Sequence, residues 1–490
     1  MSARLFIAGG FGSIGVALCA WSDQPKVDGI LPAGGKAGSS FEVAVTGTIE
    51  PWPLQAVCDD SRITFAPSEK KGRYQVEVPP DVPPGACLVR FFNKEGATVP
   101  RNFVVGSFRE RAQVGKEVLM VAIEELPLTV NGKLDSGGDV DRFVLELGKD
   151  QLVVAEVAAY AFDSPLDPLL HMWGPRGEQL AFNHDATRLG LDPRLVFRAP
   201  AAGKYELHLS AFAYPPKADI RFAGGSASIY RLTLSEELPT LHLGEPWEAN
   251  GEEPQAVALP SIMSGTMEPA GDLDRYKFSA NKGDVLRLEV AAAALGSWMD
   301  AVLVVRDSAG KELKRMDDID SKTQHDVVLD WTALADGEFT AEVFDLNGNG
   351  GSEIAYQLRI SKPAAHIKVS ASGGVYAVKA GEKIEVAVKV TRRYGHKGEL
   401  EVGIEGLPPK VSAAAVVVSE KGEAKLSLEA AEDVVSANVP ITIWARAKGE
   451  VDPAKRVSCR FEVKGAASDV GDLLINDSPR GWLTVIEKGK

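Results

Sequence analysis

The sequence predicts an all-β protein made of several β-sandwiches in tandem, and three observations support this prediction. First, segments in which apolar and polar side chains alternate recur along the chain, for example residues 41–45 (FEVAV) and 384–390 (IEVAVKV). A period of two is typical of strands with one buried face. Second, Gly- and Pro-rich turns separate these segments, and no long amphipathic helical pattern is present. Third, one block of sequence occurs twice, which indicates a duplicated folding unit.

Length and charge restrict the class of protein. A chain of 490 residues exceeds what one hydrophobic core supports, so we expect roughly three to four domains. The formal net charge is −14, whereas a nucleic-acid-binding protein needs clustered Lys and Arg to contact phosphates. We therefore expect no nucleic-acid partner.

The N-terminal segment has the pattern of an export signal. Arg4 is the only charged residue among residues 1–22, residues 5–20 are largely apolar, and residues 20–22 (AWS) offer a small-x-small cleavage site. A buried first strand is the alternative, and Cys19 lies in only a loose match to a lipoprotein box. No later segment reaches the roughly 18 apolar residues that a membrane span requires. We expect a signal peptide at 1–22, no membrane span, and a secreted, periplasmic or cell-surface location in a bacterium.

Residues 23–108 are predicted to form the first sandwich. Cys58 and Cys87 both lie on predicted strands of this unit. In an oxidising compartment a disulfide between them is expected, and it would contribute about 3–4 kcal/mol of stability. The alternative is that the two cysteines are small buried side chains.

Two repeats follow, at 115–236 and 242–362. Residues 138–143 (GDVDRF) return 133 positions later as residues 271–276 (GDLDRY). The strand that follows each turn is apolar at the same alternate positions in both copies. A shared sandwich requires this, because a slip of one residue would expose the core.

Further motifs follow in the same order in both copies: Ser-x-x-Asp-x-x-Leu, Gly-x-x-Leu, Gly-x-Tyr/Phe and Tyr-x-Leu-x-(Leu/Ile)-Ser. Together with the Gly-Asp-x-Asp-Arg turn, they resemble the bacterial pre-peptidase C-terminal (PPC) domain, a jelly-roll-like β-sandwich. The resemblance implies a role in secretion, substrate attachment or protein contacts rather than catalysis. Through Pro-x-Gly-Gly near its start and a Pro-rich turn at 79–85, the first unit resembles the Ig-like (TIG-type) domain of large bacterial surface proteins.

Apolar and polar residues alternate in several segments of 363–465, and this region is predicted to form a second Ig-like sandwich. Cys459 lies in an alternating run and is expected to be a core thiol. The C-terminal tail at 466–490 is mostly polar, but its apolar stretch 481–486 (GWLTVI) can dock as a strand on the last unit.

No catalytic constellation is apparent. The chain lacks the short motifs of serine hydrolases, zinc peptidases and nucleotide-binding loops. No CxxC pair is present, which excludes a zinc site of the usual spacing. The seven histidines include no pair four residues apart, and His171 and His208 are predicted to be ordinary strand or core residues. We therefore expect no catalytic residue and no enzymatic activity.

The PPC resemblance also implies a calcium site beside the second repeat. In PPC domains of the collagen-binding type, an acidic linker and the Gly-Asp-x-Asp turn supply oxygen ligands for Ca²⁺. The matching residues here are Glu248, Asn250, Asp272 and Asp274. The linker departs from the pattern at Pro246, and the first repeat lacks the linker. Ca²⁺ is thus the one candidate cofactor, and the alternative is a turn in which an Asp side chain caps the backbone.

Exposed aromatic residues would mark a ligand-binding face. Trp298, which replaces a proline of the first repeat, is the candidate ligand platform, whereas Trp173 and Trp331 are expected in the cores. We predict a non-catalytic, monomeric, exported bacterial protein for binding, adhesion or envelope scaffolding, with an extracellular polysaccharide or protein as its partner. The alternative is the accessory arm, for secretion or substrate attachment, of an exported peptidase or other hydrolase.

Overall fold

The structure is a computed structural model of the chain. It describes residues 24–113, 115, 118–186, 189–218, 221–236, 253–292, 297–317, 326–351, 354–418, 422–462, 475 and 477–488. These residues form strands and loops with three 3-10 helices, η1 (Ile123–Glu125), η2 (Tyr160–Phe162) and η4 (Pro453–Lys455), and no α-helix. The predicted all-β class of tandem sandwiches is therefore confirmed. No described helix has the length and apolarity to cross a membrane. The predicted signal peptide lies outside the described residues.

The first sandwich packs two sheets, in the strand orders β1-β3-β6-β5 and β2-β9-β7-β4, with β8 beside β7. Alternate side chains of both sheets, such as Val43, Tyr74 and Phe91, fill the space between them. Its strands are β1 (Lys26–Leu31), β2 (Gly34–Lys36), β3 (Ser39–Thr48), β4 (Gln55–Cys58), β5 (Thr64–Pro67), β6 (Arg73–Val78), β7 (Gly85–Asn93), β8 (Gly96–Ala97) and β9 (Arg101–Gly106).

The first repeat also contains two facing sheets, β10-β12-β19-β14-β17 and β11-β13-β18-β15-β16, with one core between them. Its strands are β10 (Arg109–Ala112), β11 (Leu119–Val121), β12 (Leu128–Lys133), β13 (Asp141–Leu147), β14 (Leu152–Ala158), β15 (Leu166–Trp173), β16 (Gln179–Asn183), β17 (Arg194–Arg198), β18 (Gly203–Ala213) and β19 (Ile229–Ser235).

Over its described residues the second repeat has the same strand order, in sheets β21-β28-β23-β26 and β20-β22-β27-β24-β25, and the residues equivalent to β10 lie outside the described ones. Equivalent strands therefore occupy equivalent places in the two copies. Its strands are β20 (Gln255–Ala256), β21 (Ser261–Thr266), β22 (Asp274–Ala280), β23 (Val285–Ala291), β24 (Ala301–Asp307), β25 (Glu312–Met316), β26 (Val327–Thr332), β27 (Gly337–Asp345) and β28 (Ala355–Ser361).

The last sandwich is completed by the C-terminal tail. The tail strand β40 (Gly481–Ile486) lies between β30, to which it is parallel, and β36, to which it is antiparallel, so the predicted docking of the tail is confirmed. The two sheets run β29-β31-β35-β33 and β30-β40-β36-β32-β34. Its other strands are β29 (His366–Ala371), β30 (Val375–Lys379), β31 (Lys383–Arg393), β32 (Leu400–Glu405), β33 (Val411–Ala413), β34 (Val416–Val418), β35 (Glu423–Ala430), β36 (Ala437–Ala447), β37 (Val457–Ser458), β38 (Phe461–Glu462) and β39 (Asp477–Ser478).

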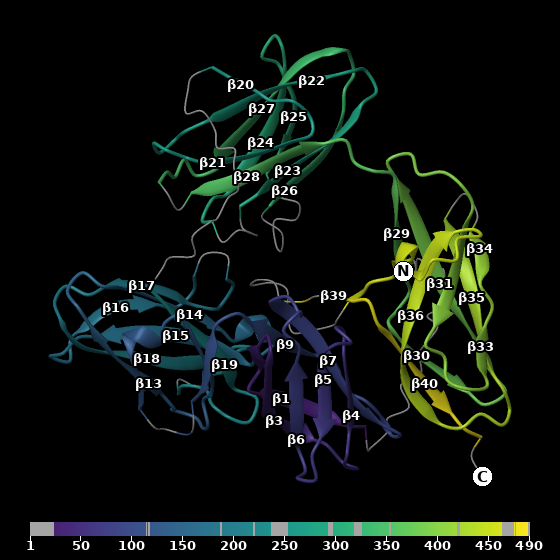
Figure 1. Cartoon of the computed structure of the whole chain (residues 1–490), viewed down its shortest axis with the longest axis horizontal. Coiled ribbons are helices and arrows are strands. Elements are labelled where there is room, and N and C mark those ends of the chain that lie inside the picture. Colours follow the sequence, from purple (N-terminus) through teal and green to yellow (C-terminus); the bar gives the residue numbers. More distant parts are fainter. Residues whose placement is uncertain are drawn as a thin grey trace, which may run out of the picture.

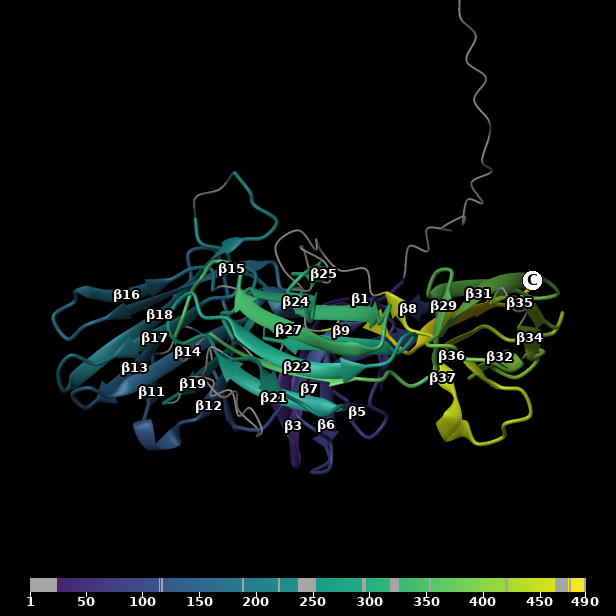
Figure 2. The same cartoon turned by 90° about the horizontal axis from the view of Figure 1, so that it is seen from above.

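Figure 1 shows the first sandwich between the first repeat and the last sandwich, with the second repeat above this row. Figure 2, seen from above, shows the row extending from β16 at one end to β34 at the other. The first and last sandwiches, far apart in the sequence, are therefore neighbours. The domain boundaries drawn from the sequence, and the Ig-like character of the two flanking units, stay predictions.

Specific side chains join the first and last sandwiches. The rings of Phe92 and Trp482 are 5.1 Å apart, and the guanidinium of Arg90 lies 5.2 Å from the Trp482 ring. The hydroxyl of Ser478 donates to the carboxylate of Asp59 at 3.0 Å. Aromatic and charge-assisted contacts of this kind hold the tail strand against the N-terminal unit.

A buried ion pair of the first repeat lies against the backbone of the first sandwich. The guanidinium of Arg231, on β19, donates to Glu110 at 2.9 Å and to Asn131 at 3.0 Å. A Cβ at Gly34 would lie 2.3 Å from Nη1 of Arg231. Glycine is required at that position because the arginine lies directly against the backbone.

Candidate functional site

The Gly-Asp-x-Asp-Arg turn places an aspartate inside the core of each repeat. Asp141 begins β13 and is 1% exposed, and Asp274 begins β22 and is 7% exposed. The hydroxyl of Tyr230 donates to Oδ2 of Asp141 at 2.5 Å, and that of Tyr356 donates to Oδ2 of Asp274 at 2.6 Å. A buried carboxyl group needs such a partner, since burial without one is costly. The motif is therefore explained by core packing.

A glycine lies beneath each of these tyrosines. Gly132 is directly opposite Tyr230 across β12 and β19, and Gly265 is directly opposite Tyr356 across β21 and β28. A Cβ at Gly132 would lie 2.1 Å from Cζ of Tyr230, and a Cβ at Gly265 would lie 2.6 Å from Oη of Tyr356. Both copies need glycine there, so that the tyrosine ring can cross the neighbouring strand and reach its aspartate.

The buried aspartate of the first repeat titrates near neutral pH. Burial raises the pKa of Asp141 to about 7, and the hydrogen bond from Tyr230 opposes that shift. Burial, with the nearby Asp141 charge second, raises the pKa of Tyr230 well above its ordinary value. A raised pKa can indicate a catalytic acid, but a carboxyl group that is 1% exposed does not meet a substrate. Asp141 and Tyr230 thus form a structural pair.

The predicted calcium ligands have other roles where the structure describes them. Asp272 accepts hydrogen bonds from the backbone N–H groups of Glu268 at 3.0 Å and Leu273 at 2.8 Å, so it caps its turn. Asp274 is buried beneath its tyrosine, as above. The predicted ligands Glu248 and Asn250 lie outside the described residues. The calcium site therefore stays a prediction.

A second group of possible metal ligands lies at one end of β15. Nε2 of His184 is 2.8 Å from Oδ1 of Asp167, and Nδ1 of His184 is 3.8 Å from Oδ2 of Asp185. Burial raises the pKa of Asp167, and the positive charge that His184 can carry opposes the shift. One nitrogen and two carboxylates could hold a divalent cation; the same contacts are also those of a histidine hydrogen-bonded to Asp167 with the Asp185 carboxylate nearby.

The three described cysteines are buried in hydrophobic cores. The Sγ atoms of Cys58 and Cys87 are 3.1 Å apart in the core of the first sandwich, as two free thiols. A disulfide requires about 2.05 Å, so the bridge stays a prediction for which the sulfurs are already adjacent. Cys459 is fully buried in the last sandwich, and burial raises its pKa to about 11.

The tryptophans only partly match expectation. Trp331 lies in the core of the second repeat as predicted, and Trp298 is 46% exposed, so its role as a ligand platform stays a prediction. The prediction for Trp173 was wrong. Leu170 and Met172 of β15 point into the core, whereas His171 and Trp173 alternate with them and face outward.

Trp173 belongs to a group of rings on the outer surface of the first repeat, which we call the aromatic–histidine face (Phe182, His171, His208, Trp173 and Arg142). Phe182, His171, His208 and Arg142 are directly opposite one another across β16, β15, β18 and β13. Directly opposite residues share one face of a sheet. The ring centroids of His171 and Phe182 are 4.7 Å apart, those of Trp173 and His208 are 5.7 Å apart, and the rings of His171 and Trp173 are nearly parallel.

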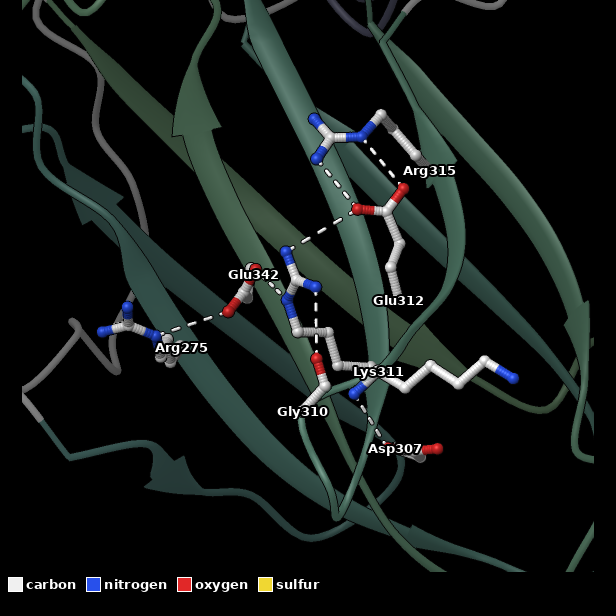
Figure 3. Close-up of polar contacts among 8 residues, drawn as sticks. Arg275, Asp307, Gly310, Lys311, Glu312, Arg315 and Glu342 are labelled. Carbon is white, nitrogen blue, oxygen red and sulfur yellow. Dashed lines mark hydrogen bonds and ion pairs between the residues drawn. The ribbon is translucent and has the colours of Figure 1, made fainter.

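The second repeat has ion-paired residues at all but one of the same positions, and Figure 3 shows them. The row equivalent to Phe182, His171, His208 and Arg142 is Arg315, Val304, Glu342 and Arg275. Glu342 accepts from Nε of Arg306 at 2.7 Å and from Nε of Arg275 at 3.4 Å. Arg306 occupies the position of Trp173 in the first repeat.

The exchange also changes the environment of the shared arginine. Arg275 pairs with Glu342, but the first repeat has His208 at the position of Glu342, and His208 bonds instead to Glu206 at 2.9 Å. No hydrogen bond or ion pair joins Arg142 to any other residue that the structure describes. Arg142 is exposed, directly opposite His208 on the neighbouring strand.

A cleft of about 650 Å³ lies where the first and last sandwiches meet. Arg90, Arg460 and Arg480 line it together with Phe461 and Glu462. Burial lowers the pKa of Arg90 to about 10, and nearby Asp59 opposes this shift. Arg460 is paired with Asp477 and Arg480 lies 3.9 Å from Asp59, so two of the three positive charges of the cleft face a carboxylate.

No family model matches the chain. A segment of 125 residues, 24% of the chain, is 35% identical to a protein named as a probable subtilase-type serine protease of Deinococcus radiodurans, of which it covers 16%. The chain thus spans about a sixth of that relative's length.

Three solved structures show weak similarity. The pre-peptidase C-terminal domain of a Bacillus anthracis collagenase is 14% identical, with a TM-score of 0.18, over 25% of this chain and 97% of that chain. A tetra-tandem repeat from the extending region of a large adhesion protein is 11% identical, with a TM-score of 0.15, over 89% and 97%. Domains 1–6 of a surface layer protein are 10% identical, with a TM-score of 0.17, over 95% and 55%. TM-scores this low do not establish a shared fold.

Proposed function

We propose that this chain is a non-catalytic, exported bacterial binding protein, and that the aromatic–histidine face of its first repeat contacts an extracellular polymer. One observation carries the proposal. The two copies share a strand order and a buried Gly–Tyr–Asp arrangement, yet three of the four ring positions of the first copy hold ion-paired residues in the other and the fourth holds Val304. Folding therefore does not require the rings.

The exposed area at this face supports a contact surface. Phe182 is 49% exposed, Leu180 beside it is 37% exposed, and Met120 at the far edge of the same sheet is 54% exposed. Isolated apolar side chains are ordinary on protein surfaces, but apolar side chains gathered on one sheet face indicate a binding site. In the second repeat, charged residues cover the equivalent face and leave less apolar surface exposed to solvent.

A passive role agrees with the contacts of the histidines. His171 contacts Gln179, His184 contacts Asp167 and His208 contacts Glu206. Among the described residues, none of the hydrogen bonds of these three histidines involves a serine or cysteine, the residues that a histidine base most often activates. The export pattern at 1–22 supports a role outside the cytoplasm.

The accessory arm of an exported hydrolase is a second candidate, because a segment of the chain is 35% identical to part of a protein named as a subtilase-type protease. Fusion of the chain to a catalytic unit, or genetic proximity to one, would favour it. Zymography of the purified chain on casein and on polysaccharides should show no clearing.

Co-sedimentation with insoluble polymers tests the proposed face. We expect the chain to sediment with at least one of cellulose, chitin, pectate gel, peptidoglycan and collagen fibres. Substituting Trp173→Ala and Phe182→Ala together should weaken that binding about tenfold, since each stacked ring contributes about 0.5–1.5 kcal/mol. The matched control is Arg306→Ala with Arg315→Ala, at the equivalent positions of the second repeat, and it should bind normally. Unchanged binding in the Trp173/Phe182 variant would refute the proposal.

A further inference from the structure

We infer that the polymer bound at the aromatic–histidine face is a polysaccharide whose sugars carry carboxylate groups. The inference rests on the proposed function and names the chemical class of its ligand. It combines three observations: a row of rings across adjacent strands, polar side chains between the rings, and an arginine at the end of the row that has no partner among the residues the structure describes.

The ring row suits a chain of sugar rings. Phe182, His171 and His208 stand directly opposite one another on adjacent strands, which are about 4.8 Å apart, a spacing close to the length of one sugar unit. The rings of His171 and Trp173 are inclined by only 16° to each other. This near-parallel pair lies along β15, whereas Phe182 on the next strand is inclined by 52° to His171. The pair can stack against the C–H face of one pyranose ring, and Phe182 can contact the neighbouring sugar unit.

The polar side chains at the face suit sugar hydroxyl groups. Nδ1 of His171 is hydrogen-bonded to Oε1 of Gln179 at 3.1 Å, and Nε2 of His208 is hydrogen-bonded to Oε2 of Glu206 at 2.9 Å. These bonds leave the other ring nitrogen of each histidine, and further lone pairs of both partners, available for hydroxyl groups. The surface does not suit an extended peptide. Such a peptide adds to the edge of a sheet through backbone hydrogen bonds, whereas this surface is the face of a sheet.

Arg142 supplies the preference for carboxylate. The second repeat neutralises the equivalent Arg275 with Glu342, at 3.4 Å between Nε and Oε1. The first repeat has His208 in place of that acid, and Arg142 has no partner among the described residues. A guanidinium presents a planar fork that a carboxylate fills with two hydrogen bonds. A sugar carboxylate would thus take the place that Glu342 takes in the other copy.

The overall charge of the chain sets the conditions for binding. At −14, the protein as a whole repels a polyanion. Charges more than about 8 Å apart are largely screened at physiological ionic strength. Under those conditions the direct contact with Arg142, rather than the net charge, determines the affinity for a polyanion. Binding assays therefore belong at about 0.15 M salt rather than at low salt.

The test uses soluble polygalacturonate and alginate, each with and without reduction of its carboxyl groups to alcohols. Isothermal titration of the full chain should show binding to at least one polyuronate and a loss of about tenfold on its reduced form. Arg142→Gln should lose about tenfold on the polyuronate and nothing on the reduced polymer. The matched control Arg275→Gln, in the second repeat, should bind as the wild type does. Phe182→Ala should weaken binding to both forms, and since Phe182 is half exposed its removal leaves the core intact.

The outcomes separate the inference from the proposed function. Equal binding to the native and reduced polymers overturns the carboxylate preference. Binding to collagen fibres alone, lost on Trp173→Ala with Phe182→Ala, overturns the polysaccharide assignment and leaves the contact surface in place. Binding that Arg142→Gln leaves unchanged also overturns the inference. Binding that no substitution at the face alters overturns the inference and the proposed function together.

Discussion

The first repeat buries Asp141 beneath Tyr230 and the second buries Asp274 beneath Tyr356, each tyrosine lying across a glycine of the neighbouring strand. The outer faces of the two copies have no comparable agreement. One carries rings and an arginine with no partner in the described part of the chain, and the other carries a network of arginines and glutamates (Figure 3).

This difference shows where a duplicated sandwich can change without losing its fold. A tyrosine whose hydroxyl meets a buried acid, and whose ring needs a glycine beneath it, depends on three positions at once, so none of them changes alone. Outward-facing positions on a sheet have no such constraint, because either rings or paired charges can cover the strands. Divergence in function is therefore expected on the outer face.

The largest effect should follow from filling the space beneath a tyrosine. In Gly132→Ala the new methyl group would meet the Tyr230 ring, displacing it from Asp141, and we expect a loss of about 2–4 kcal/mol in the stability of the first repeat. Gly265→Ala should do the same to the second repeat. Hydrogen-exchange mass spectrometry would assign each loss to its own repeat.

Gly148→Ala is the control, because no atom lies closer than 3.5 Å to a Cβ there and the second repeat has Asn281 at that position. If Gly132→Ala were as stable as Gly148→Ala, the glycine beneath the tyrosine would not be needed for stability, and the prediction would be wrong.

The next effect concerns pH. The pKa of Asp141 is raised to about 7 in the folded chain, against about 3.9 in an unfolded one. A raised folded pKa gives stability that is complete below pH 4 and disappears as pH rises through 7. Between pH 5 and 7.5 the first repeat should therefore lose about 2 kcal/mol through this group. Asp141→Asn keeps an acceptor for Tyr230 but does not titrate, so its stability should change less over that range. Parallel profiles for the two proteins would contradict the assignment.

Much of the fold followed from the sequence because alternation and turns are local signals. The strands of the duplicated units and the docking of β40 were predicted in this way. The contact between the first and last sandwiches was not predictable, since it depends on single side chains, Trp482 against Phe92 and Ser478 against Asp59. Such contacts leave no periodic pattern in the chain.

The aromatic–histidine face was missed for a related reason. In the equivalent strand β24, Val302 and Val304 face outward yet are 1% and 0% exposed, so this strand is apolar on both sides. A tryptophan in such a strand resembles a core residue when the sequence alone is considered. Comparison of outward positions between the copies, Trp173 with Arg306 and Phe182 with Arg315, was the signal that could have revealed the face.

The ion-pair network of the second repeat should give a smaller effect. Glu342 is 7% exposed and neutralises Arg275 and Arg306, so Glu342→Gln should cost about 1–2 kcal/mol by leaving two guanidinium groups with weaker partners. His208→Gln, at the same position of the first repeat, should stay within about 0.5 kcal/mol. Urea denaturation at low and high salt would check both, and the cost of Glu342→Gln should fall as salt rises. An equal cost at both positions would mean that the two faces do not differ in this way.

The smallest expected effect is that of calcium, and it too should distinguish the copies. The acidic linker with Glu248 and Asn250 precedes only the second repeat, so Ca²⁺ should protect that repeat from hydrogen exchange and leave the first unchanged. At a free concentration about five times Kd, the gain would be about 1 kcal/mol. Glu248→Gln is a better probe than a change at Asp272, because Asp272 also caps a turn and its loss would destabilise the repeat without any metal. If EDTA and Ca²⁺ gave the same exchange in the second repeat, its acidic turn would be a backbone cap alone, as the turn at Asp139 is in the first, where the carboxylate accepts from the N–H groups of Asp135 and Val140.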